Sequence, residues 1–199
     1  RQMARPRASD YDDKRRAILD RSAELFARSG FDRTSMSQIA DACGVSKGLL
    51  YHYYQNKDAL LFDIIERHLA ELIEAVEAAE TTGVDAKADL RALIFALLEA
   101  YRDADAEHKV QINDLSKLAV EQQEALKALE RRLVSIFSEA IAAANPGLGD
   151  PSRLLKPVTM ALFGMINWSY MWFREGGALT REDYADIVAR LIIEGSKGL

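Results

Sequence analysis

The residues best suited to chemistry in this chain are polar donors gathered between positions 46 and 57. Ser46 and Lys47 precede Gly48, whose missing side chain lets a partner's backbone approach closely. Hydroxyl, imidazole and ammonium groups of this kind hydrogen-bond phosphate oxygens and base edges. The set comprises Ser46, Lys47, Gly48, Tyr51, His52, Tyr53 and Lys57. The cluster predicts a surface for phosphates and bases, although tyrosine and histidine also serve as ordinary core or surface residues.

Patterns for catalysis or metal binding are not found elsewhere in the sequence. The three histidines are far apart and share no metal-ligand spacing with the single cysteine, Cys43. No glycine-rich phosphate loop occurs, and acidic neighbours such as Asp12 and Asp13 are typical of solvated helix faces. We therefore expect no enzyme, no metal and no cofactor, with Cys43 a small apolar group.

A second chemically distinct stretch, rich in aromatic residues and methionine, lies between positions 160 and 173. It holds both tryptophans of the chain and is too apolar to remain in water, so it must face a core, a ligand or a second subunit. The helix expected at 180–196 offers a matching apolar stripe. A four-helix interface between two copies is the simplest solution, with Phe163, Trp172, Tyr184, Ile187 and Leu191 as its residues.

Candidates for a small-molecule pocket are large apolar residues with polar groups near them. Helical spacing of such residues shows only that a face is buried, so ordinary core packing remains an alternative for each of them. The candidates are Tyr101, Gln111, Asn113, Phe137, Trp168 and Arg174.

The donors near position 46 need short helices to position them. Ser35 followed by Gln38 has the form of a capping box, which predicts a helix over 36–43. Gly44 ends that helix, and Ser46 caps a second one that extends to about Tyr53. Two short helices joined by a glycine turn are typical of a helix-turn-helix.

The rest of the chain is also predicted to be helical. A first helix extends from Tyr11 to Gly30, after a basic arm from Arg1 to Ser9, and a long helix extends from Asn56 to about Glu80. Further helices are expected near 85–104, 105–113, 115–144, 151–174 and 180–196. The predicted fold is all-α with about nine helices. It comprises a three-helix helix-turn-helix DNA-binding domain at 1–58 and a larger helical ligand-binding and dimerisation domain at 59–199.

Composition and charge agree with this division. The 199 residues, 49% hydrophobic, can bury a sizeable core. A net charge of −5 argues against nucleic acid, but residues 1–57 carry eleven Lys and Arg against seven Asp and Glu, a net +4, whereas residues 58–199 carry fifteen against twenty-four, a net −9. This asymmetry favours a DNA-binding head on an acidic body. No apolar run approaches membrane-spanning length, so we expect no membrane partner and a cytoplasmic location.

The run from Thr34 to Leu61, which reads TSMSQIADACGVSKGLLYHYYQNKDALL, closely resembles the N-terminal signature of TetR-family regulators. So do Ala23–Phe26 and the Gly30-Phe31 pair that follows. The resemblance covers about residues 14–62. It implies a homodimer that binds double-stranded, palindromic operator DNA and a C-terminal body that senses a small molecule.

Carried over position by position, the resemblance also implies which head residues contact DNA and which pack inside. Leu49 departs from the family, which often has a small or hydroxylated residue there; it either contacts a thymine methyl group or turns inward. The implied core residues are Ala40, Val45, Leu50 and Tyr54, and the implied DNA contacts are Thr34, Ser46, Lys47, Gly48, Tyr51, His52, Tyr53 and Lys57.

The C-terminal run LFGMINWSYMWFR at 162–174 resembles a TetR subgroup that responds to acyl-CoA thioesters. This likeness implies an acyl-CoA or aryl-CoA effector, with Arg174 or Arg102 near its anionic part. Drugs or free acids are alternative effectors. A helical protein-binding adaptor without DNA binding is a further alternative, against which the intact Lys47, Tyr51, His52 and Lys57 set weighs.

Overall fold

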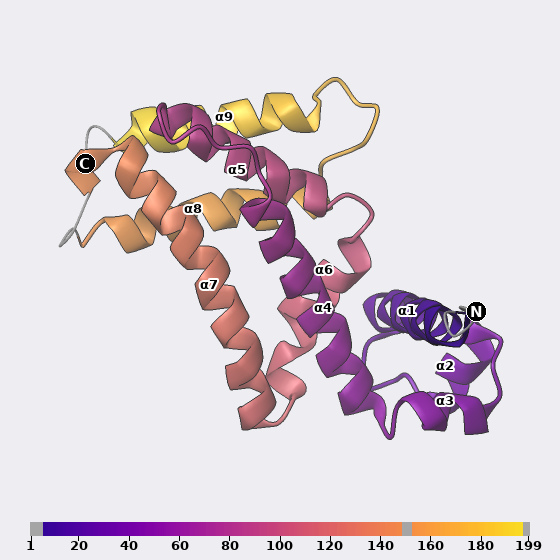
Figure 1. The fold of residues 1–199 in the computed structure, drawn as a ribbon. Coiled ribbons are helices and arrows are strands. Elements are labelled where there is room, and N and C mark those ends of the chain that lie inside the picture. Colours follow the sequence, from indigo (N-terminus) through magenta and orange to yellow (C-terminus); the bar gives the residue numbers. More distant parts are fainter. Residues whose placement is uncertain (1–5, 149–152, 197–199) are drawn as a thin grey trace, which may run out of the picture. The chain divides into compact units, whose positions relative to one another are not determined.

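The computed structural model describes residues 6–148 and 153–196, with side chains from Tyr11 onward. These residues form nine α-helices and three short 3₁₀ helices, with no strand among them (Figure 1). The all-α prediction is therefore confirmed. The α-helices are α1 (Pro6–Ser29), α2 (Met36–Cys43), α3 (Lys47–Tyr53), α4 (Lys57–Glu77), α5 (Ala86–Ala100), α6 (Asp105–Asp114), α7 (Val120–Ala144), α8 (Leu155–Asn167) and α9 (Arg181–Gly195). The 3₁₀ helices are η1 (Leu115–Lys117), η2 (Pro146–Leu148) and η3 (Ser169–Met171).

The described residues pack as two compact units. The first contains the chain up to His68 together with Asp103–Leu126, and the second contains Leu69–Arg102 together with the chain from Lys127 onward. Helices α4 and α7 each begin in the first unit and end in the second. The units differ from the predicted division at residue 58, because α6 packs against α1 and so belongs to the first unit. We call this first unit the head.

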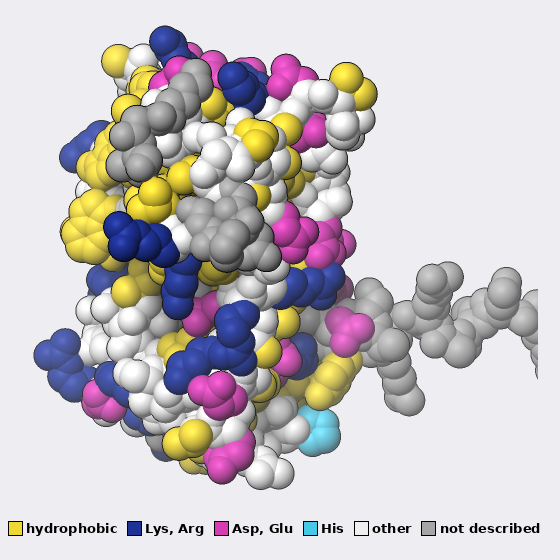
Figure 2. Space-filling view, turned by 90° about the vertical axis from the view of Figure 1, so that its left-hand side faces the viewer, with side chains coloured by type: hydrophobic (Ala, Val, Ile, Leu, Met, Phe, Trp, Pro, Cys, Tyr) yellow, Lys and Arg dark blue, Asp and Glu magenta, His cyan; other side chains and the backbone are white. Residues whose placement is uncertain are grey.

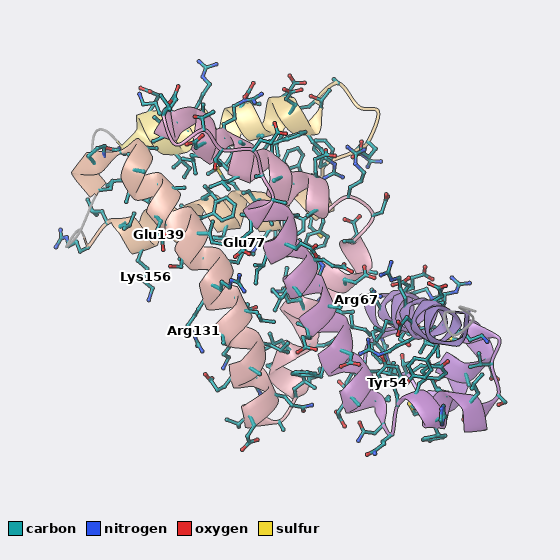
Figure 3. The ribbon with its side chains drawn as sticks, in the orientation of Figure 1. Tyr54, Arg67, Glu77, Arg131, Glu139 and Lys156 are labelled. Atoms are coloured by element: carbon teal, nitrogen blue, oxygen red, sulfur yellow. The ribbon has the colours of Figure 1, made fainter. Side chains whose placement is uncertain are left out.

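The head has an apolar core with polar ties around it. Phe26, Ile39 and Leu50 are fully buried and join α1, α2 and α3. Arg67 of α4 is labelled in Figure 3. Its guanidinium lies 2.5 Å from a carboxylate oxygen of Asp20 on α1 and 3.7 Å from one of Glu107 on α6. These contacts hold α1 and α6 to α4 within the first unit.

A buried histidine pair also lies in the head. The rings of His68 on α4 and His108 on α6 are 5.8 Å apart, and both side chains are almost fully buried. Burial is the main cause that lowers the pKa of His68 to about 3, and the neighbouring His108 and Arg67 lower it further. His68 is therefore neutral at physiological pH.

The second unit is built around α9. Helices α5 and α8 both pack against α9, and Arg91 of α5 forms ion pairs with Glu182 and Asp186 on its outer side. Phe137 and Phe163 meet edge to face in the core, with ring centroids 5.3 Å apart. The core therefore draws its residues from α4, α5, α7, α8 and α9.

Two predicted helix boundaries are wrong. Helix α1 begins at Pro6 instead of Tyr11, because proline is well suited to the first helical position; Arg1–Arg5 of the predicted basic arm lie outside the described residues. The helix predicted over 151–174 ends at Asn167 and gives way to η3. Beyond Asn167 the backbone forms the shorter bonds of a 3₁₀ helix, from the Met171 amide to the Trp168 carbonyl and from the Trp172 amide to the Ser169 carbonyl. The Met165 carbonyl accepts from the Tyr184 hydroxyl.

The helix predicted over 115–144 is also interrupted, at Leu118. Its backbone is extended there, between η1 and α7. The Gln123 side-chain amide donates to the carbonyls of Ser116 and Leu118, so the interruption leaves these acceptors satisfied.

The surface carries both signs of charge. On the face drawn in Figure 2, dark-blue basic side chains and magenta acidic ones are interspersed, with yellow hydrophobic side chains among them. None of the described helices has a stretch long and apolar enough to span a bilayer.

Candidate nucleic-acid interface

The two short helices of the head are held by the predicted caps. The Ser35 hydroxyl accepts from the Gln38 backbone amide at 3.2 Å, and the Gln38 side chain accepts from the Ser35 amide at 2.8 Å. Gly44 ends α2 with φ +64, a conformation that glycine adopts without strain. The Ser46 hydroxyl then accepts from the Leu49 amide at 3.1 Å and begins α3. The predicted helix-turn-helix is therefore confirmed.

Helix α3 has a buried side and an exposed side. Leu50 is fully buried and Tyr54 nearly so, as expected for core residues. On the other side, Tyr51 is 52% exposed and Leu49 is 37% exposed. Leu49 therefore faces outward, which favours the first of its two predicted roles. The exposed residues of this surface are Ser46, Lys47, Gly48, Leu49, Tyr51 and His52, and we call them the reading surface.

Tyr53 is half-buried and is held by another aromatic ring. Tyr11 of α1 stacks on it with ring centroids 4.6 Å apart and planes at 26°. The His52 ring meets Tyr53 edge to face at 5.8 Å. Sequence reasoning did not identify Tyr11, because nothing local at position 11 reveals a contact with a residue 42 positions later.

Thr34 and Lys57 are placed differently from the predicted phosphate contacts. Thr34 is only 2% exposed, and its hydroxyl donates to the Gly30 carbonyl at 2.8 Å. Lys57 is half-buried, and its ammonium donates to the Phe31 carbonyl at 2.8 Å while lying 4.5 Å from the Phe31 ring centre. Both side chains therefore hold the turn between α1 and α2, and burial of Thr34 leaves its hydroxyl without a surface to offer DNA.

The single cysteine has the environment of a packing residue. Cys43 is half-buried at the end of α2. Burial raises the pKa of its thiol, and the positive charge of Arg21 only partly opposes this effect. A thiol with a raised pKa is a poor nucleophile.

The six predicted pocket residues do not gather in one unit. Gln111 and Asn113 lie on α6 in the first unit, whereas the other four belong to the second. Phe137 is fully buried core, while Trp168 and Arg174 are exposed. Helical periodicity could not separate these cases, because it identifies a buried face but not what fills the space beside it.

Tyr101 keeps a polar group inside the apolar core of the second unit. Its hydroxyl donates to the Asn167 side-chain carbonyl at 2.8 Å, joining the end of α5 to the end of α8. Burial raises the pKa of Tyr101, so the phenol remains protonated and able to donate. The pair places two hydrogen-bonding groups within a largely apolar core, the arrangement that orients ligands in apolar pockets.

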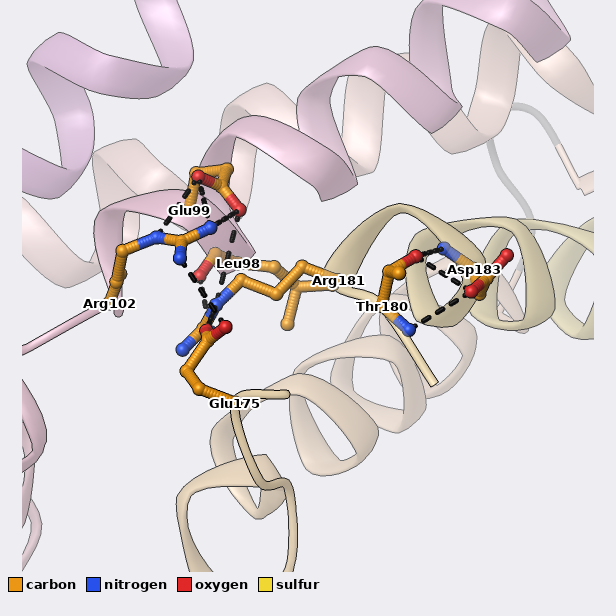
Figure 4. A network of polar contacts seen from close by, with 7 residues as sticks. All are labelled: Leu98, Glu99, Arg102, Glu175, Thr180, Arg181 and Asp183. Atoms are coloured by element: carbon orange, nitrogen blue, oxygen red, sulfur yellow. Dashed lines mark hydrogen bonds and ion pairs between the residues drawn. The ribbon is translucent and has the colours of Figure 1, made fainter. Parts of the chain in front are cut away.

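The charged loop before α9 is tied to the end of α5 (Figure 4). The Arg181 guanidinium, 12% exposed, donates to the Leu98 carbonyl at 2.8 Å and lies 2.5 Å from Glu175. Arg102 pairs with Glu99 at 2.7 Å and with Glu175 at 3.3 Å. A surface hollow of about 330 Å³ lies beside this network. Arg102 thus already has two carboxylate partners, and its role beside an anionic effector stays a prediction.

Helices α8 and α9 present an apolar outer surface, but two of the predicted interface residues lie beneath it. Phe163 packs on Phe137, and Tyr184 bonds to Met165 within the same protomer, so both are core residues. Positions three or four residues apart along a helix share a face, and only the structure shows which face is covered. The large apolar residues exposed on α8, on α9 and in the segment between them are Met160, Trp168, Met171, Trp172, Ile187 and Leu191, and we call them the α8–α9 face.

Comparison with known proteins identifies the family. The family described as bacterial regulatory proteins, tetR family, matches residues 18–64, and the tetracyclin repressor-like C-terminal domain matches residues 83–196. The chain belongs to the TetR family. It is thus a TetR-type, DNA-binding transcriptional regulator and not an enzyme.

Individual TetR-type proteins resemble this chain over nearly its whole length. A TetR-family regulator from Bordetella parapertussis 12822 is 32% identical, with a TM-score of 0.84 over 93% of this chain and 96% of its own. The transcriptional repressor KstR2 of Rhodococcus jostii RHA1 is 27% identical over 97% of each chain. AibR, solved with isovaleryl coenzyme A and operator DNA, is 29% identical, with a TM-score of 0.74 over 89% of this chain and 97% of its own.

Proposed function

We propose that this TetR-type regulator is a dimeric repressor that binds a palindromic operator through two reading surfaces and is released by an acyl-CoA thioester. The observation that carries the proposal is the exposed, capped N-terminus of α3. This N-terminus presents Ser46, Lys47 and Gly48 to solvent, followed one turn later by Tyr51. The N-terminal residues of a recognition helix are those that meet base edges in the major groove.

Operator binding is tested by selecting duplexes from a random pool with the purified protein. We expect one enriched sequence with two related half-sites, bound with an affinity that falls steeply as salt rises. The expected half-site spacing is about one helical turn or a multiple of it. Enrichment of no sequence would overturn the proposal and favour the adaptor alternative.

The dimer proposal rests on the α8–α9 face. Ile187 and Leu191 project from α9 beside a hollow of about 340 Å³ that Arg190, Glu194 and Gly195 complete. A contiguous exposed apolar patch marks an interaction site, and a two-fold dimer brings the same patch of both copies together. Light scattering should give twice the 22.2 kDa mass of the chain at micromolar concentration. A monomer would contradict this part of the proposal.

The acyl-CoA proposal is supported by AibR, which was solved with isovaleryl coenzyme A, and by the Tyr101–Asn167 pair. A thioester has an apolar acyl group and one carbonyl, which suits an apolar core with few polar groups. Isovaleryl-CoA, free isovalerate and CoA alone are the probes. A thioester at 100 times its Kd should stabilise the fold by about 2.7 kcal/mol, or roughly 5–10 °C in melting temperature.

The same thioester should release the operator, and free isovalerate should not. Tyr101→Phe keeps the ring but removes the hydroxyl, so it should reduce the thioester's effect on melting while leaving operator affinity intact. Release by the free acid alone would favour the free-acid alternative, and release by neither probe would leave the drug-responsive one.

A further inference from the structure

The turn between α1 and α2 is held from a distant part of the chain. The Lys117 ammonium, at the end of η1, lies 2.6 Å from a carboxylate oxygen of Asp32 in that turn, 85 residues earlier. The same ammonium lies 3.0 Å from Asp114, whose carboxylate is almost fully buried. Lys117 is thus anchored on its own segment and reaches the turn from there.

The aromatic ring in the turn receives two ammonium groups. Lys57 of α4 lies 4.5 Å from the centre of the Phe31 ring, and Lys117 lies 5.7 Å from it. Lys57 also donates to the Phe31 carbonyl, as described above. Phe31 itself packs edge to face on Phe26 in the head core. Two cations from separate elements therefore fix one short segment.

This segment sets where the reading helices begin. Thr34 bonds back to Gly30 and Phe31, and the next residue, Ser35, is the cap of α2. Helix α2 leads through the Gly44 turn directly into α3. A change in the turn would therefore alter how the reading surface is presented, without touching any of its residues.

We propose that Lys117 is a positioning residue for operator recognition, because its ion pair with Asp32 fixes the turn that leads into the helix-turn-helix. The proposal rests on the operator binding proposed above. The hydrogen bond between the two groups raises the pKa of Lys117 and lowers that of Asp32, so both stay charged across the neutral range. Exposed ion pairs add little to stability, so the effect should lie in recognition more than in folding.

The decisive variant is Asp32→Asn, because two explanations predict opposite signs. Removing a negative charge from a surface near DNA raises affinity if charge alone matters. If the ion pair positions the turn, Asp32→Asn instead weakens binding to the selected operator by about 3- to 10-fold, toward the lower end of the coupling between contacting residues. Affinity for a random duplex should stay equal or rise.

Companion variants separate positioning from simple charge loss. Lys117→Met also removes the partner of the nearly buried Asp114, so it should weaken operator binding at least as much as Asp32→Asn does. The double variant should bind no more weakly than Lys117→Met alone. Lys117→Arg keeps the cation and should bind within twofold of the parent. Lys109→Met removes an exposed charge from α6 and serves as the matched control for charge loss.

Three outcomes would overturn the proposal. Asp32→Asn could bind the operator more tightly, or the losses of operator affinity in the two single variants could add up in the double variant. The third is an equal loss of affinity for operator and random duplex together with a lower melting temperature. If the parent protein binds the selected operator and one of these occurs, only the role of Lys117 falls. If the parent enriches no operator, the proposed function falls and this proposal with it.

Discussion

Gly48→Ala should raise the thermal stability of the protein and weaken its binding to the operator. Gly48 is the second residue of α3, its φ lies outside the left-handed region, and a Cβ built on it meets nothing within 4 Å among the described residues. The folded head therefore does not require a glycine there. If operator binding requires glycine at position 48, the reason is a close contact with DNA and not the fold of the head.

The size of both effects can be worked out from this geometry. Alanine in a helix is favoured over glycine by about 0.5–1 kcal/mol, which corresponds to a rise of roughly 1–4 °C in melting temperature for a chain of this size. A methyl group inserted into a tight contact with DNA costs about 1–3 kcal/mol, by analogy with overpacked cores. That cost corresponds to about 5- to 150-fold weaker operator binding.

The assay combines a thermal melt with a titration of labelled operator. Gly147→Ala is the matched control, since its Cβ would make an ordinary contact of 3.5 Å with Asn145 in the second unit and operator affinity should not change. An unchanged or tighter operator complex with Gly48→Ala would refute the reasoning that DNA approaches the backbone of α3 at this point.

The remaining predictions concern the dimer, the reading surface and acid stability. Leu191→Arg should raise the dimer dissociation constant by at least about 30-fold in sedimentation experiments, as for a buried hot spot. Val84→Arg, which changes a 91% exposed loop residue, should leave this constant unchanged. A dimer unaffected by both variants would place the interface elsewhere. Tyr51→Ala should weaken operator binding about 10-fold with an unchanged melting temperature. Lys57→Met should weaken operator binding and also lower the free energy of unfolding by about 1 kcal/mol, because the bond from Lys57 to the α1–α2 turn is lost. Equal melting temperatures for the two variants would contradict this distinction. Because the pKa of His68 is about 3 in the folded state and about 6.5 when unfolded, unfolding takes up a proton between these values. The free energy of unfolding should therefore be fully retained above pH 6.5 and fall by up to about 1.4 kcal/mol per pH unit as the pH drops toward 3. Urea titrations should show a shallower pH slope for His68→Phe, and an identical slope would rule out His68 as the source.

Local signals in the sequence were sufficient for the head. Ser35 with Gln38, Gly44 and Ser46 each act within a few residues, and the structure places every one of these caps as expected. Such signals depend on backbone groups next to the residue itself, so they survive without knowledge of the tertiary fold. The helix-turn-helix could therefore be predicted almost completely.

Long-range packing could not be derived in the same way. The periodicity of α9 places Tyr184, Ile187, Val188 and Leu191 within one stripe, yet Tyr184 and Val188 are core while Ile187 and Leu191 are exposed. The stripe is wide enough to serve two surfaces, and its division depends on where α5 and α8 pack. The association of α6 with the head depends equally on partners far away in the sequence.

Thr34 and Lys57 show why a motif alone does not establish contact with DNA. Both have the right chemistry for phosphate and lie where the family likeness implies contact, but the structure uses both within the α1–α2 turn. Thr34 and Lys57 differ from Lys47 and Tyr51 because they are more buried and already form hydrogen bonds within the protein. Neither property can be predicted from the residue type alone. The reading surface is consequently narrower than the motif suggests, and its geometry depends on a turn held by Lys57 and by Lys117. Specificity in this head should therefore respond to changes in that turn as well as to changes in the exposed residues of α3.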